Sequence, residues 1–214
     1  LKLPLAFAHL EGGARLFCRG EGGLERCGQA RRQARFHVTG LERVNDVEYV
    51  HGTGGFMVRR QDVRVAVQRR RPPRVAATDR WVHFDLRDQV MVAYEGDRPV
   101  YVTLISSGKE GHDTPTGLFH IYTKWISHRM VGTDEKDGPY DIDEVPWVMF
   151  YKNSYAVHGA YWHNTYGQVR SHGCTNLSPA DASWLFHWTA NPLPSGWHGL
   201  NVGNGKGTMF FFTR

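Results

Sequence analysis

The sequence predicts a mainly β protein of two domains, and three observations carry this prediction. The 24 glycines and ten prolines are spread along 214 residues without a repeat, which is typical of many short strands and turns. Apolar and polar residues alternate over many short stretches, as in strands with one buried face. The stretch 69–74, reading RRRPPR, interrupts this pattern with adjacent prolines and charge, which is typical of a linker.

We expect a small basic all-β domain at residues 1–79, with the linker near 68–79, and a second domain at residues 80–214. The first domain contains alternating stretches separated by glycine-rich turns, at residues 36–39, 47–50, 56–59 and 63–67. This pattern predicts a small, mostly antiparallel barrel or sandwich. Its short strands and turns resemble those of SH3-like modules.

The second domain is predicted to contain a β-meander followed by further strands and one or two short helices. The predicted strands lie at residues 81–86, 89–94, 99–106, 118–122, 145–150, 154–159 and 209–212. A helix is expected after Ser178, because Ser178 suits an N-cap and Pro179 suits the first helical position. Asp181 then favours the positive end of that helix.

The regular pattern lapses between about residues 124 and 145, where acidic residues gather around Gly138 and Pro139. A long loop inside a compact domain is often a lid or a binding loop. We therefore expect an acidic lid loop here. The carboxylate spacing lacks the ordered ligand pattern of a calcium loop, and a solvated turn explains the charges as well.

The net charge of +5 is unevenly distributed along the chain. Residues 1–79 hold fifteen Lys and Arg against eight Asp and Glu, whereas residues 80–214 hold eleven against thirteen. The basic part favours a weak attraction to polyanions, and both nucleic acid and anionic wall polymers have the required charge. A solvated basic face without a specific ligand explains the same residues. No apolar run approaches the roughly 18 residues needed to cross a bilayer.

Three cysteines are present, so at least one has no partner within the chain. Cys18 and Cys27 lie nine residues apart, and they either form a disulfide in an oxidising compartment or are two buried apolar residues. In both cases Cys174 is a free thiol. Residues 1–10 lack the charged start and long apolar stretch of a signal peptide, so we expect a mature or trimmed chain.

The sharpest chemical signal is the string SHGCTN, which lies just before the predicted helix. A thiol is a poor nucleophile until it is ionised, so a catalytic Cys174 needs a histidine beside it. His172 is close in sequence, and His158 lies upstream at the end of a predicted strand. Gly173 lets the backbone approach a reacting carbonyl. An isolated cysteine is more often a small buried apolar residue, so the case for a catalytic Cys174 depends on the surrounding motifs.

These motifs resemble the signature of L,D-transpeptidases with the YkuD-type catalytic domain. The resemblance rests on SHGCTN, on TPTGLF at residues 114–119 and on SYAVHGAYW at residues 154–162. It covers roughly residues 81–189 and the final strand, and it leaves residues 1–79 outside. It implies a catalytic domain with the β-sandwich fold of that family.

The resemblance also implies roles for individual residues. Cys174 would be the nucleophile and His158 the base, with the carbonyl of Gly159 orienting the imidazole. His172 would lie in the same pocket, and the two histidines could exchange roles. The backbone N–H groups of Gly173 and Cys174 would stabilise the oxyanion.

Five further residues are candidates for contact with substrate, namely Ser171, Asn176, Trp162, Arg170 and Tyr140. Plain packing explains Asn176 and Trp162 as well, since tryptophan is a common core residue. A guanidinium suits carboxylate recognition, although Arg170 also fits an ordinary surface position. Tyr140 lies in the acidic segment, where it would close over the acyl donor.

The implied activity is the cross-linking of peptidoglycan stem peptides through a cysteine acyl-enzyme, which places the protein in the periplasm or at the cell surface. An L,D-carboxypeptidase or a hydrolase that releases wall proteins would use the same thiol with water. A non-catalytic wall-binding protein is the alternative of another class. We expect no cofactor and no metal, since no HExxH-like spacing occurs. We also expect a monomer that does not bind nucleic acid, with residues 1–79 contacting anionic wall polymers.

Overall fold

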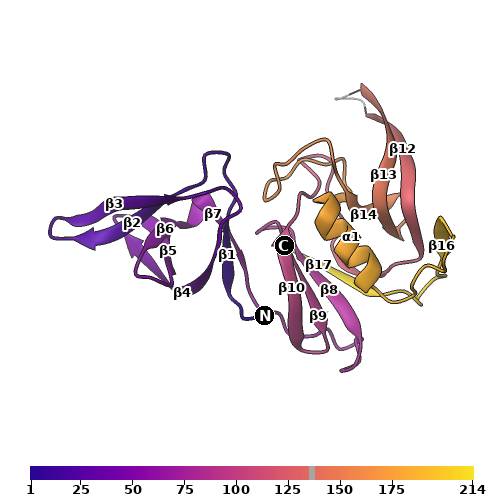
Figure 1. The fold of residues 1–214 in the computed structure, drawn as a ribbon, viewed down its shortest axis with the longest axis horizontal. Helices are drawn as coiled ribbons and strands as arrows, with labels where there is room; N and C mark the ends of the chain where they lie inside the picture. Colours follow the sequence, from indigo (N-terminus) through magenta and orange to yellow (C-terminus); the bar gives the residue numbers. More distant parts are fainter. Residues whose placement is uncertain (135–137) are drawn as a thin grey trace.

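The computed structural model describes residues 1–134 and 138–214 of the chain. Within these residues, strands arranged in three sheets make up most of the regular structure, together with one α-helix (Figure 1). This confirms the predicted mainly β fold class. In the same part of the chain, no helix is long and apolar enough to cross a membrane.

The N-terminal sheet has seven strands in the order β3-β2-β6-β5-β4-β1-β7. These are β1 (Leu5–Ala8), β2 (Ala14–Gly20), β3 (Gly23–Ala30), β4 (Arg35–Val44), β5 (Val47–Gly52), β6 (Met57–Arg59) and β7 (Val63–Ala66), with a 3₁₀ turn, η1 (Arg60–Asp62), before β7. All six pairs of neighbouring strands in this sheet are antiparallel, as the glycine-rich turns predict. The likeness to SH3-like modules stays a prediction.

The second sheet has five strands in the order β10-β9-β8-β17-β11. These are β8 (Arg80–Asp85), β9 (Val90–Glu95), β10 (Arg98–Leu104), β11 (Gly117–His120) and β17 (Met209–Thr213). The predicted meander is therefore confirmed as β8, β9 and β10. The final strand β17 pairs in parallel with β8 and antiparallel with β11, so the end of the chain lies inside this sheet, between the meander and β11.

The third sheet has five strands in the order β15-β14-β13-β12-β16. These are β12 (Thr123–Asp134), β13 (Gly138–Lys152), β14 (Tyr155–Gly159), β15 (Thr175–Leu177) and β16 (Gly199–Asn201). Apolar side chains of the second and third sheets, including Phe84 and Phe212 from one and Met149 and Val157 from the other, share one buried core. The two sheets are thus packed as a sandwich.

The helix α1 (Pro179–Trp188) begins where the sequence predicts. The Ser178 side chain accepts a hydrogen bond from the Asp181 backbone N–H at 3.1 Å, as an N-cap does. At the other end, the buried Lys124 donates from Nζ to the carbonyl of Phe186 at 2.7 Å. A cation at the C-terminus of a helix is favourable, so both ends are fixed beside the third sheet.

The prediction of an irregular acidic loop is wrong. Strands β12 and β13 instead form a long antiparallel hairpin, from Thr123↔Phe150 to Asp134↔Gly138. Arg129 forms ion pairs with Asp141 and Asp143, so opposite charges across the hairpin stabilise it. A register shift between His128 and Met130 breaks the alternation that would have revealed the strand. Glu135 and Asp137 of the predicted loop lie outside the described residues. In Figure 1 the hairpin projects beyond the sandwich.

The predicted linker is held against the second sheet. Arg69 forms an ion pair with the buried Asp85 at 2.9 Å, and Arg71 forms one with Asp97 at 3.2 Å. Leu5 and Phe7 of β1 belong to the same buried cluster as residues of the second sheet, including Trp81, Val102 and Leu104. The N-terminal sheet and the sandwich therefore share an apolar core instead of being joined by a free tether.

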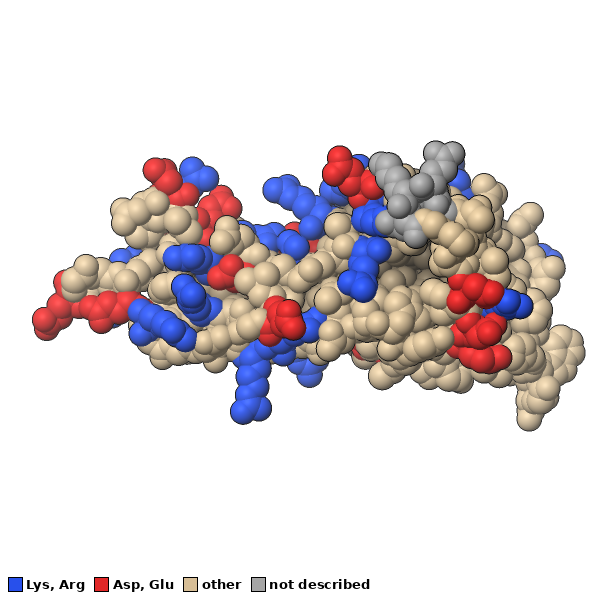
Figure 2. All heavy atoms as spheres, turned by 90° about the horizontal axis from the view of Figure 1, so that it is seen from above, with Lys and Arg blue, Asp and Glu red and all other residues tan. Residues whose placement is uncertain are grey.

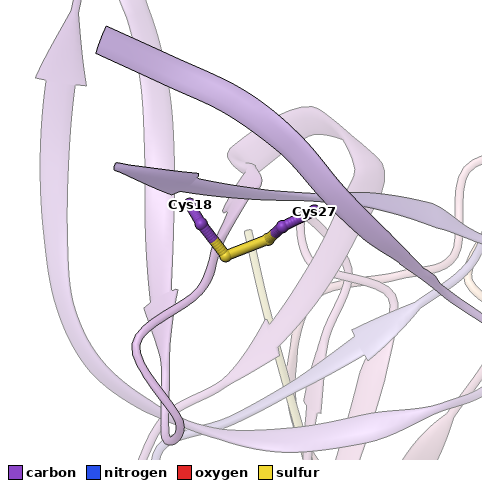
Figure 3. Close-up of a disulfide and its surroundings, with 2 residues drawn as sticks. All are labelled: Cys18 and Cys27. Carbon is purple, nitrogen blue, oxygen red and sulfur yellow. A yellow bond between two sulfur atoms is a disulfide. The ribbon is translucent and has the colours of Figure 1, made fainter. Parts of the chain in front are cut away.

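The structure contains a disulfide between Cys18 on β2 and Cys27 on β3, whose Cα atoms lie 5.7 Å apart (Figure 3). It joins neighbouring antiparallel strands of an exposed hairpin. Cys174 is the free cysteine, and it is half-buried.

Candidate active site

The pairing of two short strands brings Cys174 close to His158. Strand β15 pairs in parallel with β14, with Val157 opposite Thr175 and His158 opposite Asn176. Cys174 directly precedes β15 and packs against a cluster that contains Ala156. Because side chains alternate along a strand, Ala156 and His158 lie on the same face of the sheet. The thiol and the imidazole therefore occupy adjacent positions on that face.

Both side chains line a cavity of about 500 Å³, which also holds most of the predicted site residues. The lining residues are Lys109, Met130, Tyr140, Ile142, His158, Trp162, Val169, Arg170, Ser171, His172, Cys174 and Asn176. Eight of the ten predicted site residues belong to this set. The two glycines, Gly159 and Gly173, contribute backbone groups next to it.

His158 is buried, and its Nδ1 lies 3.0 Å from the carbonyl oxygen of Gly159. A carbonyl only accepts hydrogen bonds, so Nδ1 carries the proton and Nε2 keeps a lone pair. Burial lowers the pKa of His158 to about 4, and the bond to Gly159 opposes this shift. The ring is therefore neutral near pH 7 and has one basic nitrogen.

The Cys174 thiol lies 3.8 Å from the carbonyl oxygen of Ser154, in the turn between β13 and β14. Burial raises the pKa of this thiol, although a hydrogen bond from the backbone of Ala156 acts in the opposite direction. A raised thiol pKa beside a lowered imidazole pKa favours a resting pair in which both groups are neutral.

A network of hydrogen bonds fixes the turn that precedes Cys174. Ser171 donates from Oγ to the carbonyl of Cys174 and accepts from the N–H of Gly173 at 3.1 Å. Thr114, from the TPTGLF motif, donates from Oγ1 to the carbonyl of Gly173 at 2.7 Å. Gly173 has a φ of 115°, which disfavours any residue with a side chain.

This network changes the prediction for the oxyanion donors. The N–H of Gly173 is already bonded to Ser171, so it does not point freely into the cavity. Of the two predicted donors, the N–H of Cys174 is the remaining candidate.

Aromatic contacts position three further predicted residues. The His172 ring stacks on Tyr140, with centroids 5.3 Å apart, and meets His112 edge to face at 4.9 Å. Tyr140 comes from the β12–β13 hairpin, so this hairpin reaches the site as a lid would. Trp162 stacks near His158, with centroids 5.8 Å apart, and it is exposed on its outer side.

The sequence interpretation missed His163, Lys109 and three apolar residues. It gave His163 no role, but His163 Nε2 lies 3.0 Å from the side-chain amide of Asn176. Burial lowers the pKa of His163 to about 4, and the nearby charge of Arg170 adds to this shift. Met130, Ile142 and Val169 line the cavity. The spacing of Tyr140 and Ile142, two residues apart in a strand, was the available signal for that face.

Within residues 1–134 and 138–214, no three His, Cys, Asp or Glu side chains form a group that could hold a metal ion. The absence of a metal from the reaction stays a prediction.

Comparison with known proteins identifies the family. The profile of the YkuD family, the L,D-transpeptidase catalytic domain, matches residues 79–208, which is more than half of the chain. The chain belongs to the L,D-transpeptidase family. No curated protein matches the sequence significantly.

Solved structures of L,D-transpeptidases resemble the chain in fold. The avibactam carbamoyl enzyme of Ldtfm is 27% identical, with a TM-score of 0.51 over 64% of this chain and 49% of that one. The catalytic domain of the Enterococcus faecium L,D-transpeptidase is 26% identical, with a TM-score of 0.50 over 64% of this chain and 98% of that one. An L,D-transpeptidase from Mycobacterium smegmatis is 18% identical, with a TM-score of 0.53 over 78% of this chain and 76% of that one.

The chain spans about half of the length of Ldtfm and of the longer Enterococcus faecium L,D-transpeptidase structure. The likeness to the catalytic domain alone covers nearly all of that domain. The match to this L,D-transpeptidase family therefore concerns the catalytic sandwich and its site.

Proposed function

We propose that this L,D-transpeptidase cross-links peptidoglycan stem peptides through an acyl-enzyme on Cys174, with His158 as the base. The observation that carries the proposal is the shared cavity, in which a half-buried thiol and a neutral imidazole with one free nitrogen lie on adjacent positions. Membership of the family supplies the substrate class.

The first half-reaction transfers the acyl group to sulfur. Cys174 Sγ attacks the carbonyl carbon of the third stem residue while its proton moves to His158 Nε2. The C–N bond to the terminal D-amino acid then breaks, and His158 returns the proton to the departing amine. The product is a thioester and a free amino acid.

The second half-reaction transfers the acyl group to an amine of another stem. His158 takes a proton from the attacking amine, the C–S bond breaks and the proton returns to the thiolate. This two-step scheme requires a base that is unprotonated at neutral pH, and the low pKa of His158 meets that requirement.

The developing oxyanion needs donors that are already in place. The N–H of Cys174 is the donor that we assign, because the N–H of Gly173 is bonded to Ser171. The Ser171 hydroxyl then acts by holding the turn, through its bonds to the backbone of Gly173 and Cys174.

The cavity walls suit a peptide that carries a carboxylate. Arg170 is exposed at the rim, and a guanidinium binds carboxylates in a bidentate manner. Tyr140 and Trp162 both line the cavity, where Tyr140 stacks on His172 and Trp162 stacks on His158. Asn176 is buried at the cavity wall, where its side-chain amide lies 3.0 Å from His163 Nε2.

We place the reaction in the periplasm or at the cell surface, where peptidoglycan lies. The N-terminal part would add affinity for anionic wall polymers through its excess of arginine. Figure 2 shows basic side chains over this part interspersed with acidic ones, so the attraction would be weak and sensitive to salt. Sedimentation with purified sacculi at low and high salt tests this contribution. Binding that does not change with salt concentration would exclude an electrostatic contribution from the N-terminal part.

The decisive experiment incubates the protein with purified muropeptides and resolves the products by mass. We expect cross-linked dimers, and Cys174→Ala should abolish them. Trimmed monomers without dimers would indicate water as the acceptor and a carboxypeptidase. Unchanged activity in Cys174→Ala would exclude the mechanism, and a wall-binding protein would yield no product.

A covalent probe gives an independent reading of the thiol. Ldtfm forms a carbamoyl enzyme with avibactam. If this chain reacts in the same way, intact-protein mass should show the adduct in the wild type but not in Cys174→Ala.

A further inference from the structure

The segment 160–170, here called the active-site loop, joins β14 to the turn before Cys174. It has no regular secondary structure, yet it supplies Trp162, Val169 and Arg170 to the cavity. It also carries His163, which contacts Asn176. The conformation of this loop therefore decides the shape of one wall of the site.

An arginine of the N-terminal sheet binds the first half of this loop. Arg32 lies in the turn between β3 and β4, and its guanidinium donates to the side-chain oxygen of Asn164 at 3.1 Å and to the backbone carbonyl of Asn164. Two bonds from one planar group fix orientation as well as distance.

A second arginine binds the other half. Arg64 on β7 donates from Nε to the carbonyl of Gly167 at 2.7 Å. His9 packs directly on Gly167, and a Cβ atom at that position would lie 2.6 Å from the His9 Cβ. Gly167 has a φ of 95°, so both its backbone and its lack of a side chain suit this close approach.

Apolar packing joins these two contacts. Tyr166 is buried in the cluster that also contains Leu5 and Phe7 of the N-terminal sheet. Its hydroxyl donates to the carbonyl of Ala160 at 2.6 Å, which ties the start of the loop to its middle. The loop is thus held at Asn164, Tyr166 and Gly167 by residues more than 90 positions away in sequence.

These contacts lead to the nucleophile in a few steps. Asn164 is adjacent to His163, His163 contacts the Asn176 side chain, and Asn176 lies two residues after Cys174. On the other side, the Arg170 N–H donates to the Ser107 carbonyl at 2.8 Å, next to the bond from Ser171 to the same carbonyl at 3.0 Å.

From this arrangement we infer that Arg32 and Arg64 of the N-terminal sheet are positioning residues that hold the active-site loop in its substrate-binding conformation. The inference rests on the proposed function, because it assigns the loop to the binding of the stem peptide. The N-terminal part then contributes to catalysis through the loop, separately from any affinity for wall polymers.

The test uses the full chain with Arg32→Ala, Arg64→Ala and the double substitution. Arg26→Ala is the matched control, because Arg26 is exposed on β3 and bonds to Gln29 within the same sheet. Arg32→Lys and Arg64→Lys serve as conservative variants, since an ammonium can still donate a hydrogen bond to a carbonyl but lacks the planar fork of a guanidinium.

The first readout is hydrogen exchange followed by mass spectrometry. In the double variant, the peptide covering residues 160–170 should exchange about tenfold faster, while peptides of the second sheet exchange as in the wild type. Arg26→Ala should leave both unchanged. Unchanged exchange at 160–170 would overturn the inference. Equally faster exchange throughout the chain would also overturn it, because it would show a general loss of stability.

The second readout separates positioning from thiol reactivity. We expect kcat/KM for a tetrapeptide stem donor to fall about tenfold in the double variant, while alkylation of Cys174 by iodoacetamide changes less than twofold. The lysine variants should recover part of the loss. Equal losses in both reactions would overturn the inference. If the wild type formed no dimers, the proposed cross-linking would fail on its own. Hydrogen exchange at residues 160–170 and the rate of Cys174 acylation by avibactam would then still test whether the two arginines position the loop.

Discussion

The N-terminal sheet and the catalytic sandwich are stabilised in different ways. The separate core of the N-terminal sheet consists of small buried residues, namely Ala6, Ala8, Ala14, Val50, Val58, Val63 and Val65. The sandwich instead buries large aromatic rings such as Phe84, Phe210 and Phe212, which stack or meet edge to face. Burial energy grows with apolar area, so the sandwich holds most of the hydrophobic stabilisation.

The difference indicates a mutual dependence between the two parts. The N-terminal sheet gains stability from its disulfide and from docking Leu5 and Phe7 into a core shared with the sandwich. In return, it contacts the loop that lines the site. The chemistry belongs to one part and some of the positioning to the other, and substitutions in each part test this division.

The largest expected effect comes from removing the base within the sandwich. In His158→Gln, the amide can still donate to the Gly159 carbonyl but offers no basic nitrogen. We expect the rate of Cys174 acylation to fall by about 10²- to 10⁴-fold, with little change in thermal stability. Single-turnover acylation with a stem donor measures this rate.

His187→Gln is the control, since His187 is exposed on α1 and bonds to the Ser183 carbonyl. A loss below threefold in His158→Gln would exclude His158 as the base. A larger loss in His172→Gln would instead assign the base to His172.

The second expected effect is an acid sensitivity of the sandwich. Burial lowers the pKa of His83, His158 and His163 to about 4, against 6.5 for an unperturbed histidine. Between these values the unfolded chain binds more protons, so stability is lost as the pH falls from about 6.5 towards 4. The loss should be on the order of 1 kcal/mol for each of the two most buried rings, His83 and His158.

Tryptophan fluorescence measures this effect selectively, because all seven tryptophans lie in residues 80–214. The urea midpoint of the fluorescence transition should be lower at pH 5 than at pH 7, and His83→Gln should reduce the difference. A midpoint independent of pH would show that the pKa values of these histidines do not differ between the folded and the unfolded chain, against the expectation.

The features that sequence predicted well depend on neighbouring residues. The meander of β8, β9 and β10 follows from alternation and tight turns, and the start of α1 follows from Ser178 and Pro179. Short motifs singled out Cys174, His158 and Gly159; in the structure Cys174 and His158 line one cavity, and the Gly159 carbonyl lies 3.0 Å from His158 Nδ1.

The features that sequence did not reveal depend on distant contacts. The β12–β13 hairpin was taken for a loop because a register shift at Met130 interrupts its pattern. The role of His163 depends on Asn176, thirteen residues away, and nothing in either local sequence connects them. The shared core likewise joins Leu5 to Val102, so the docking of the two parts appears only in three dimensions.

A third effect, on the N-terminal sheet, is expected from removing the disulfide. Cys18→Ser with Cys27→Ser should destabilise the β2–β3 region by about 2–3 kcal/mol, because a short loop is no longer closed in the unfolded chain. Hydrogen exchange of residues 14–30 should accelerate, while residues 80–104 change little. Equal acceleration in both regions would show that the two parts unfold as one unit.

The smallest effect is expected at the charged contact between the two parts. Asp88, in the turn between β8 and β9, accepts from Arg60 at 2.6 Å and from the N–H of Val65 at 3.0 Å. Asp88→Asn keeps an oxygen for Val65 but loses the ion pair. A cycle with Arg60→Gln, followed by urea unfolding, should give a coupling of about 1 kcal/mol, because both side chains are only partly shielded from water.

Asp97→Asn is the control for this cycle, since Asp97 is exposed and pairs with Arg71 of the linker. A coupling well above that value would mean that charge holds the two parts together. The expected small value means that the apolar contacts of Leu5 and Phe7 supply most of the docking energy. The ion pair would then fix the orientation in which Arg64, four residues after Arg60, meets the active-site loop.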